Sequence, residues 1–102
     1  MLFDNGSLDA TLAAAAGDDP SLLAELRGAF VESVARQLDL LKRARCDGNW
    51  IVAAMRLKGL AASFHAEELI GLADEALASA PGDPVILRRI EAFLTAFVAR
   101  GT

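Results

Sequence analysis

The sequence predicts an all-α fold, an antiparallel four-helix bundle with a short extra helix at its N-terminal end. Hydrophobic residues make up 54% of the 102 residues, mostly Ala and Leu, and Tyr is absent, a composition that favours packed helices. Apolar residues recur at spacings of three and four, the period of a helix face. The turn signals between these stretches are short, so neighbouring helices are expected to run antiparallel within one domain spanning residues 1–102.

The first two expected helices are separated by a glycine and an Asp-Pro pair. A short apolar helix is expected over residues 9–16, with Gly17 as its left-handed stop. Asp19 precedes Pro20 and is expected to cap a long helix that runs to about Arg45. That helix carries one apolar stripe, formed by Leu23, Leu26, Phe30, Val34, Leu38 and Leu41.

Three more helices follow at recognisable turn signals. Residues 47–49 (Asp-Gly-Asn) are expected to break the long helix and to cap a second one over residues 50–64. A third helix is expected over residues 66–80. The final helix begins at Asp83-Pro84, and its stripe consists of Ile86, Ile90, Phe93, Leu94 and Phe97.

Charge and composition exclude several classes of function. A net charge of −4 argues against non-specific nucleic-acid binding, which needs a concentrated basic face. No run approaches the 18 apolar residues of a membrane span, so no membrane partner is expected. With one histidine and one cysteine the chain has no recognisable metal site, and no cofactor is expected. A reduced, cytoplasmic protein is the simplest expectation.

Charged residues and Cys46 gather where the long helix is expected to end. Lys42, Arg43 and Arg45 form a small basic cluster there, which stabilises the negative end of the helix dipole. Cys46 is expected at the same helix end, where the dipole disfavours a thiolate. We therefore assign neither feature a reactive role.

The helix over residues 50–64 has an unusual outer side. At about 100° per residue, its core side consists of Trp50, Ala53, Ala54, Leu57, Leu60, Ala61 and Phe64. The opposite arc holds Ile51, Val52, Met55, Lys58, Gly59 and Ala62, which apart from Lys58 are apolar or small. Gly59 costs a helix about 1 kcal/mol relative to alanine. This side of the helix is therefore expected to have a role other than stabilising the helix.

The run from Ala54 to Phe64 resembles the phosphoacceptor motif of bacterial histidine-containing phosphotransfer (HPt) domains. That motif reads His, any residue, Leu, Lys, Gly, then small residues and an aromatic residue or Leu before a turn. The matching residues are Leu57, Lys58, Gly59, Ala61, Ala62, Ser63 and Phe64. Met55 stands where the family's histidine belongs. The order of the helices extends the resemblance over roughly residues 8–98.

The resemblance implies a role in two-component phosphorelay signalling, with a receiver domain of a response regulator or hybrid kinase as partner. In HPt domains the matching glycine leaves room for the receiver, and the matching lysine neutralises the phosphoryl group. A thioether lacks the nucleophilic nitrogen that phosphoryl transfer needs, so Met55 implies docking without phosphate acceptance and no enzymatic activity. The expected receiver-binding residues are Ile51, Val52, Met55, Arg56, Lys58, Gly59 and Ala62.

Three alternatives remain open. His65, the only histidine, is an alternative phosphoacceptor, but Glu67 and Glu68 follow it and would repel a phosphoryl group. It would lie about 15 Å beyond Met55 along a continuous helix. A homodimer through Ile51, Val52 and Met55, with no receiver affinity, is a second alternative. In the third, Met55 reflects neutral drift or is covered by another helix.

Overall fold

The computed structural model describes residues 6–101, and this part of the chain forms five α-helices and no strands. The all-α prediction is therefore confirmed. In chain order the helices are α1 (Gly6–Ala16), α2 (Pro20–Arg43), α3 (Asp47–Ser63), α4 (Glu67–Leu77) and α5 (Pro84–Arg100).

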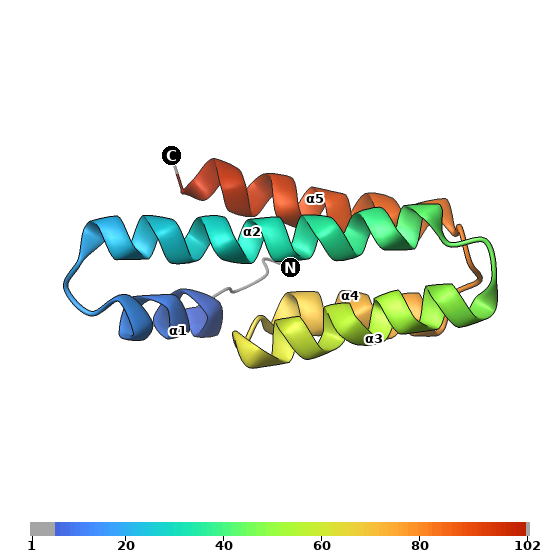
Figure 1. Cartoon of the computed structure of the whole chain (residues 1–102), viewed down its shortest axis with the longest axis horizontal. Coiled ribbons are helices and arrows are strands. Elements are labelled where there is room, and N and C mark those ends of the chain that lie inside the picture. Colours follow the sequence, from blue (N-terminus) through green and yellow to red (C-terminus); the bar gives the residue numbers. More distant parts are fainter. Residues whose placement is uncertain (1–5, 102) are drawn as a thin grey trace.

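The longest helix, α2, lies in the middle of the arrangement. It packs against α1, α3 and α5, and α4 packs against α3 and α5. Successive helices from α2 to α5 reverse direction at each turn, and α1 lies beyond the end of α3 along the same side of α2 (Figure 1). α2 thus contacts three of the other helices, and α1 packs along the part of α2 that extends past α3 (Figure 1).

The core receives side chains from all five helices. Its largest fully buried members are Trp50, Phe30, Phe97, Leu8, Leu12, Leu41, Leu57, Leu69, Ile90 and Val34. The ring of Phe30 on α2 lies edge-on to Phe64, with centroids 5.0 Å apart, and to Phe97 on α5, with centroids 5.3 Å apart. Edge-to-face contacts of this kind add about 0.5–1.5 kcal/mol to the stabilisation from burial. The apolar stripes expected for α2 and α5 both contribute to this core.

Two helices begin at the predicted Asp-Pro pairs. Asp19 Oδ1 accepts hydrogen bonds from the backbone N–H groups of Ser21 at 3.0 Å and Leu22 at 3.2 Å. At α5, Asp83 Oδ1 accepts from the Val85 N–H at 2.9 Å. Each carboxylate satisfies donors that have no partner within the helix, and the following proline has no N–H to satisfy. Both predicted caps are confirmed.

The connection between α2 and α3 differs from the prediction. α2 ends at Arg43 rather than Arg45, because the buried Ala44 adopts extended backbone with ψ 130°. Cys46 is the N-cap of α3, and it makes no capping hydrogen bond through its side chain. Residues 47–49 therefore form the first turn of α3 and do not precede it. Cys46 lies at the positive end of a helix dipole, the opposite of the expected end.

The turn between α3 and α4 is a Schellman motif. The Ala66 N–H donates to the Ala61 carbonyl at 2.8 Å, and the His65 N–H donates to the Ala62 carbonyl at 3.1 Å. The motif requires one residue in the left-handed region, and here that residue is His65, with φ 56°. Ala61 and Ala66 are both fully buried and supply the apolar contact that accompanies such caps.

Helices α1 and α4 have different bounds from those predicted. α1 begins at Gly6, before the expected Asp9. α4 ends at Leu77 rather than Ala80, and the Ser79 N–H bonds to the Ala76 carbonyl in a tightened last turn.

Candidate functional site

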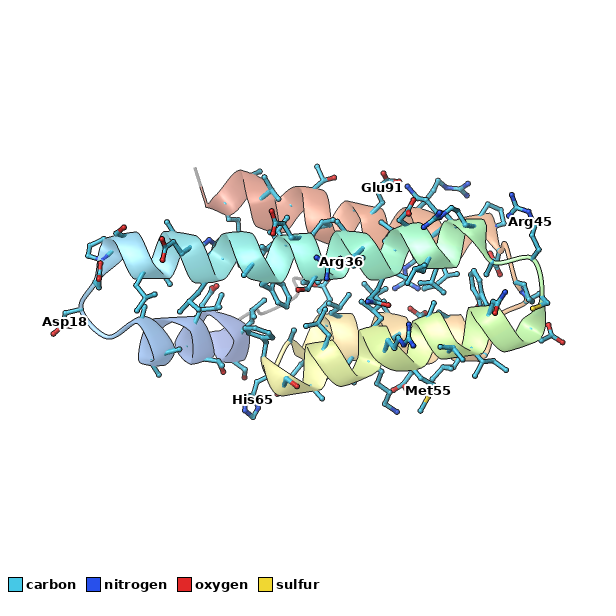
Figure 2. The ribbon with its side chains drawn as sticks, viewed as in Figure 1. Asp18, Arg36, Arg45, Met55, His65 and Glu91 are labelled. Atoms are coloured by element: carbon cyan, nitrogen blue, oxygen red, sulfur yellow. The ribbon has the colours of Figure 1, made fainter. Side chains whose placement is uncertain are left out.

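Seven residues on the outer side of α3 form what we call the α3 surface: Ile51, Val52, Met55, Arg56, Lys58, Gly59 and Ala62. Six of them are exposed, and Lys58 is partly buried. Ile51, Val52 and Met55 are 47%, 49% and 54% exposed, although all three are large and apolar. Figure 2 shows Met55 pointing away from the other helices. The expected division of α3 into a core side and an outer side is observed.

The rotation of α3 is set by its opposite side. The buried residues there are Trp50, Ala53, Ala54, Leu57 and Ala61. Trp50 is 1% exposed, and its indole N–H donates to the Ala76 carbonyl of α4 at 2.7 Å. Rotating α3 would break this buried hydrogen bond and expose the ring, so the α3 surface is held outward by the packing beneath it.

Lys58, the partly buried member of the α3 surface, forms an ion pair with α4. Its Nζ lies 2.8 Å from Oδ1 of Asp74. The cation that the HPt resemblance assigns to a phosphoryl group is thus neutralised by a carboxylate in the free protein. Sequence reasoning missed Asp74, because the pair joins two helices and depends on how α4 packs against α3.

The space above Gly59 is open. A Cβ atom added at Gly59 would meet no atom within 4 Å, so the packing of this chain does not require glycine there. Gly28 on α2 and Gly71 on α4 are equally open, so interior glycine is not peculiar to α3. Gly59 differs from those two in lying one turn beyond Met55 on the α3 surface.

The seven residues of the α3 surface carry apolar, small and cationic side chains and no imidazole. Met55 presents a thioether, Arg56 a guanidinium and Lys58 an ammonium, and none of these is a nucleophile suited to attack a phosphoryl group at neutral pH. A flexible, polarisable methionine and two cations suit an adaptable contact with an acidic partner.

His65 does not belong to the α3 surface. It follows the C-cap of α3, in the turn before α4, and is exposed. Within residues 6–101 its side chain makes no hydrogen bond or ion pair. Figure 2 shows His65 near the end of α3 that lies away from the α2–α3 connection, separated from Met55 along the helix. Its backbone has a structural role in the turn.

A groove adjoins the α3 surface, and we call it the α2–α3 groove. It has a volume of about 360 Å³ and is lined by Leu40, Arg43, Ala44, Asn49, Val52, Ala53 and Arg56. Val52 and Arg56 belong to both the groove and the α3 surface. Sequence reasoning did not connect Arg43 with Arg56, since it explained Arg43 by the dipole of α2 alone.

Further features of the described residues bear on function. Among residues 6–101, no cluster of three or more His, Cys, Asp or Glu side chains has the proximity needed to hold a metal ion. In the same range, no helix combines the length and apolar character of a membrane span. Comparisons with protein-family models, with curated proteins and with solved structures found no match to this chain.

Proposed function

We propose that this protein is a degenerate HPt domain that docks receiver domains of response regulators or hybrid kinases without accepting phosphate. By occupying a receiver, it would compete with phosphorelay partners or act as a scaffold for them. The observation that carries the proposal is that Met55, Lys58, Gly59 and Ala62 share the outer side of one helix, with Met55 where the motif has histidine.

The proposed architecture is an antiparallel four-helix bundle of α2 to α5, with α1 as the extra N-terminal helix. Two observations support it: α2 to α5 reverse direction at each turn, and each packs against two others of the four. We also propose a cytoplasmic location. The exposed, unpaired Cys46 is consistent with a reducing compartment.

An NMR titration tests receiver docking. Isotope-labelled protein is titrated with receiver domains from the same organism, in unphosphorylated and phosphate-mimic forms. We expect shifts concentrated at the amides of Met55, Lys58, Gly59 and Ala62. Ile51→Asp should abolish them, whereas Val85→Asp should not, because Val85 is similarly exposed, at 55%, but lies on α5. Absence of shifts with every receiver would overturn the proposal.

Restoring the nucleophile tests whether only that group is missing. We expect Met55→His to accept an acid-labile phosphoryl group from a phosphorylated receiver, while the natural chain accepts none. If the natural chain became labelled, and His65→Gln removed the label, the protein would instead be an active phosphotransfer protein using His65.

A homodimer is the second candidate function, favoured by the exposure of Ile51, Val52 and Met55 together on one helix. Sedimentation equilibrium measures it directly. A dimer that Met55→Asp dissociates and Val85→Asp leaves intact, together with no receiver-induced shifts, would make self-association the function of the α3 surface.

A further inference from the structure

We propose that the α2–α3 groove binds an acidic segment of the partner protein. In this arrangement a carboxylate of the segment pairs with Arg43 and Arg56, and a neighbouring apolar side chain lies against Leu40 and Val52. The inference rests on the proposed function in one respect, that the segment belongs to the protein docked on the adjoining α3 surface.

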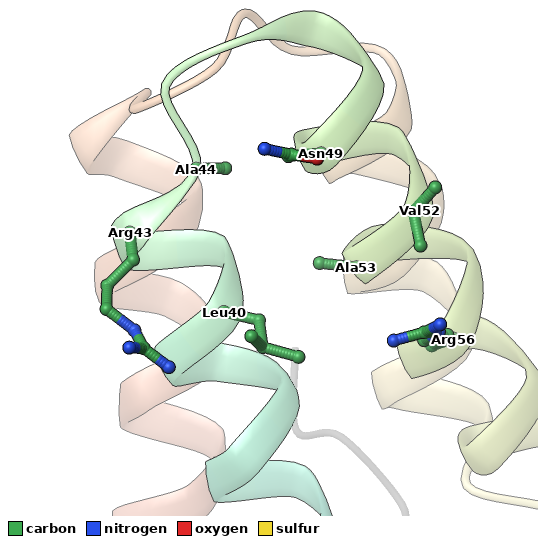
Figure 3. A pocket seen from close by; sticks show the side chains of 7 residues that line it. All are labelled: Leu40, Arg43, Ala44, Asn49, Val52, Ala53 and Arg56. Atoms are coloured by element: carbon green, nitrogen blue, oxygen red, sulfur yellow. The ribbon is translucent and has the colours of Figure 1, made fainter.

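The two arginines lie on opposite sides of the groove. Arg43 extends from the last turn of α2 and Arg56 from the middle of α3, while Leu40 and Ala53 point into the space between the helices (Figure 3). Asn49 lines the end nearest the α2–α3 connection and adds an amide that can donate or accept. A volume of about 360 Å³ is at the small end of ligand pockets and fits one or two side chains.

The charge of the groove is opposite to that of the whole chain. The protein carries a net charge of −4, yet the residues lining the groove include two arginines and neither Asp nor Glu. Arginine binds carboxylates through parallel hydrogen bonds in a fixed geometry, so two arginines lining one groove favour an anionic occupant.

Arg56 is not paired with a carboxylate of its own chain. Lys42, Lys58, Arg89 and Arg100 each form an ion pair with a carboxylate of another helix. Within residues 6–101, Arg56 makes neither an ion pair nor a hydrogen bond through its side chain. Its charge is therefore available to a partner.

Arg43 can exchange its present partner. Its Nη2 lies 2.9 Å from Oδ2 of Asp39, but the two side chains are 68% and 61% exposed. Exposed ion pairs within one helix contribute little to stability, because water screens them, so a better-placed carboxylate can displace Asp39.

The apolar lining favours a peptide over a free anion or a nucleic acid. Leu40, Ala44, Val52 and Ala53 contribute apolar walls, and Val52 continues onto the exposed Ile51 and Met55 of the α3 surface. A nucleic acid needs an extended basic surface, which a chain with net charge −4 does not favour. An acidic residue next to an aliphatic one matches both properties of the groove.

Short peptides test the groove separately from the α3 surface. The labelled full chain is titrated with an end-capped Gly-Glu-Leu-Glu-Gly peptide, and separately with the same peptide carrying Gln in place of Glu. We expect the Glu peptide to shift the amides of Leu40, Arg43 and Asn49, with an affinity that falls as salt is raised. The Gln peptide should produce no comparable shifts.

Matched variants identify the cations. Arg56→Glu should weaken binding of the Glu peptide by at least about tenfold, and Arg43→Glu should also weaken it. Arg88→Glu makes the same charge change at an exposed arginine of α5 that has no ion pair within the described residues, and should alter the affinity by less than about twofold. Amide spectra of each variant without peptide verify that it is folded.

Several results would overturn the inference. The first is that the groove amides do not shift at millimolar Glu peptide, and the second is that the Gln peptide shifts them equally. The third is that Arg56→Glu and Arg88→Glu lose equal affinity for the Glu peptide. The fourth is that an oligothymidine binds more strongly than the Glu peptide. If the groove amides shift with the concentration of the protein and not with that of the peptide, the groove binds a second copy of the chain. Receiver docking is read at Gly59 and Ala62, so either proposal can fail while the other stands.

Discussion

Lys58 on α3 and Asp74 on α4 are joined by an ion pair of 2.8 Å, and their side chains are 42% and 51% exposed. The pair lies at the edge of the α3 surface and holds the Lys58 ammonium against α4. Exposed ion pairs contribute at most about 1 kcal/mol, because water screens the attraction and two long side chains lose freedom. An anion brought in by a docked partner can therefore displace Asp74 at little cost.

Removing the carboxylate should release Lys58 for binding. We expect Asp74→Asn to raise the affinity for a phosphate-mimic receiver by about two- to fivefold and to change the free energy of unfolding by less than about 1 kcal/mol. Calorimetric titration and urea denaturation measure the two quantities. The matched control is Glu75→Gln, which removes the neighbouring carboxylate that pairs with Arg89 of α5. A lower receiver affinity in Asp74→Asn than in this control would contradict the prediction.

Replacing Gly59 with alanine should not destabilise the protein but should weaken receiver docking. Gly59→Ala removes a backbone entropy cost without a steric clash, so we expect the free energy of unfolding to rise by up to about 1 kcal/mol. The added methyl group should weaken receiver binding, because it fills the open space beside Met55. Gly71→Ala on α4 makes the same change away from the α3 surface. It should stabilise the protein similarly and leave receiver affinity unchanged, and equal affinities for both variants would refute a docking role for Gly59.

His65 should be a destabilising residue at its turn. Its φ of 56° is costly for a side chain with a Cβ atom and costs glycine nothing. We expect His65→Gly to raise the free energy of unfolding by about 1 kcal/mol, measured by chemical denaturation. His65→Ala keeps a Cβ and should give a much smaller change. Destabilisation by His65→Gly would mean that the imidazole contributes more to the folded state than its exposure indicates.

The pKa of Glu68 produces a pH dependence of stability. Burial at the start of α4 raises the pKa of this carboxyl above 4.5, and the nearby charges of Arg89 and Arg100 offset part of the rise. Folding therefore favours the protonated carboxyl. Its contribution to stability is fully present below pH 4.5, the pKa expected in the unfolded chain, and is lost as pH rises through the folded pKa.

Glu68→Gln should remove this dependence. We expect the variant to be more stable, relative to the natural chain, near neutral pH than below pH 4.5. Below pH 4.5 the Glu68 carboxyl and the amide that replaces it are both uncharged, so the two proteins differ less. Urea denaturation across this range measures the difference, and carboxyl NMR of Glu68 gives the folded pKa directly. A titration midpoint below 4.5 would contradict the prediction.

Much of the fold was predictable because its determinants are local. The caps at Asp19 and Asp83 involve N–H groups two or three residues away, so the Asp-Pro signal was sufficient to predict them. Apolar periodicity likewise assigned Trp50 to the core and Met55 to the outside, since the position of each residue around a helix depends only on its spacing from the others.

The connections were less predictable where tertiary packing outweighs local preference. Burial of Ala44 ends α2 early and makes Cys46 the N-cap of α3, although Asp-Gly-Asn just beyond it is the stronger cap signal. At the next turn, buried Ala61 and Ala66 hold the chain in a conformation that leaves His65 at positive φ.

The sequence by itself determined the helices, the caps of α2 and α5 at Asp19 and Asp83, and the core-facing sides of α2, α3 and α5, because these depend on residues within about one helical turn of one another. Only the tertiary structure decided that Lys58 pairs with Asp74 and that Arg43 and Arg56 share a groove. Such contacts depend on the rotation and offset of one helix against another. The whole core sets both, including the packing of Phe30 against Phe64 and Phe97.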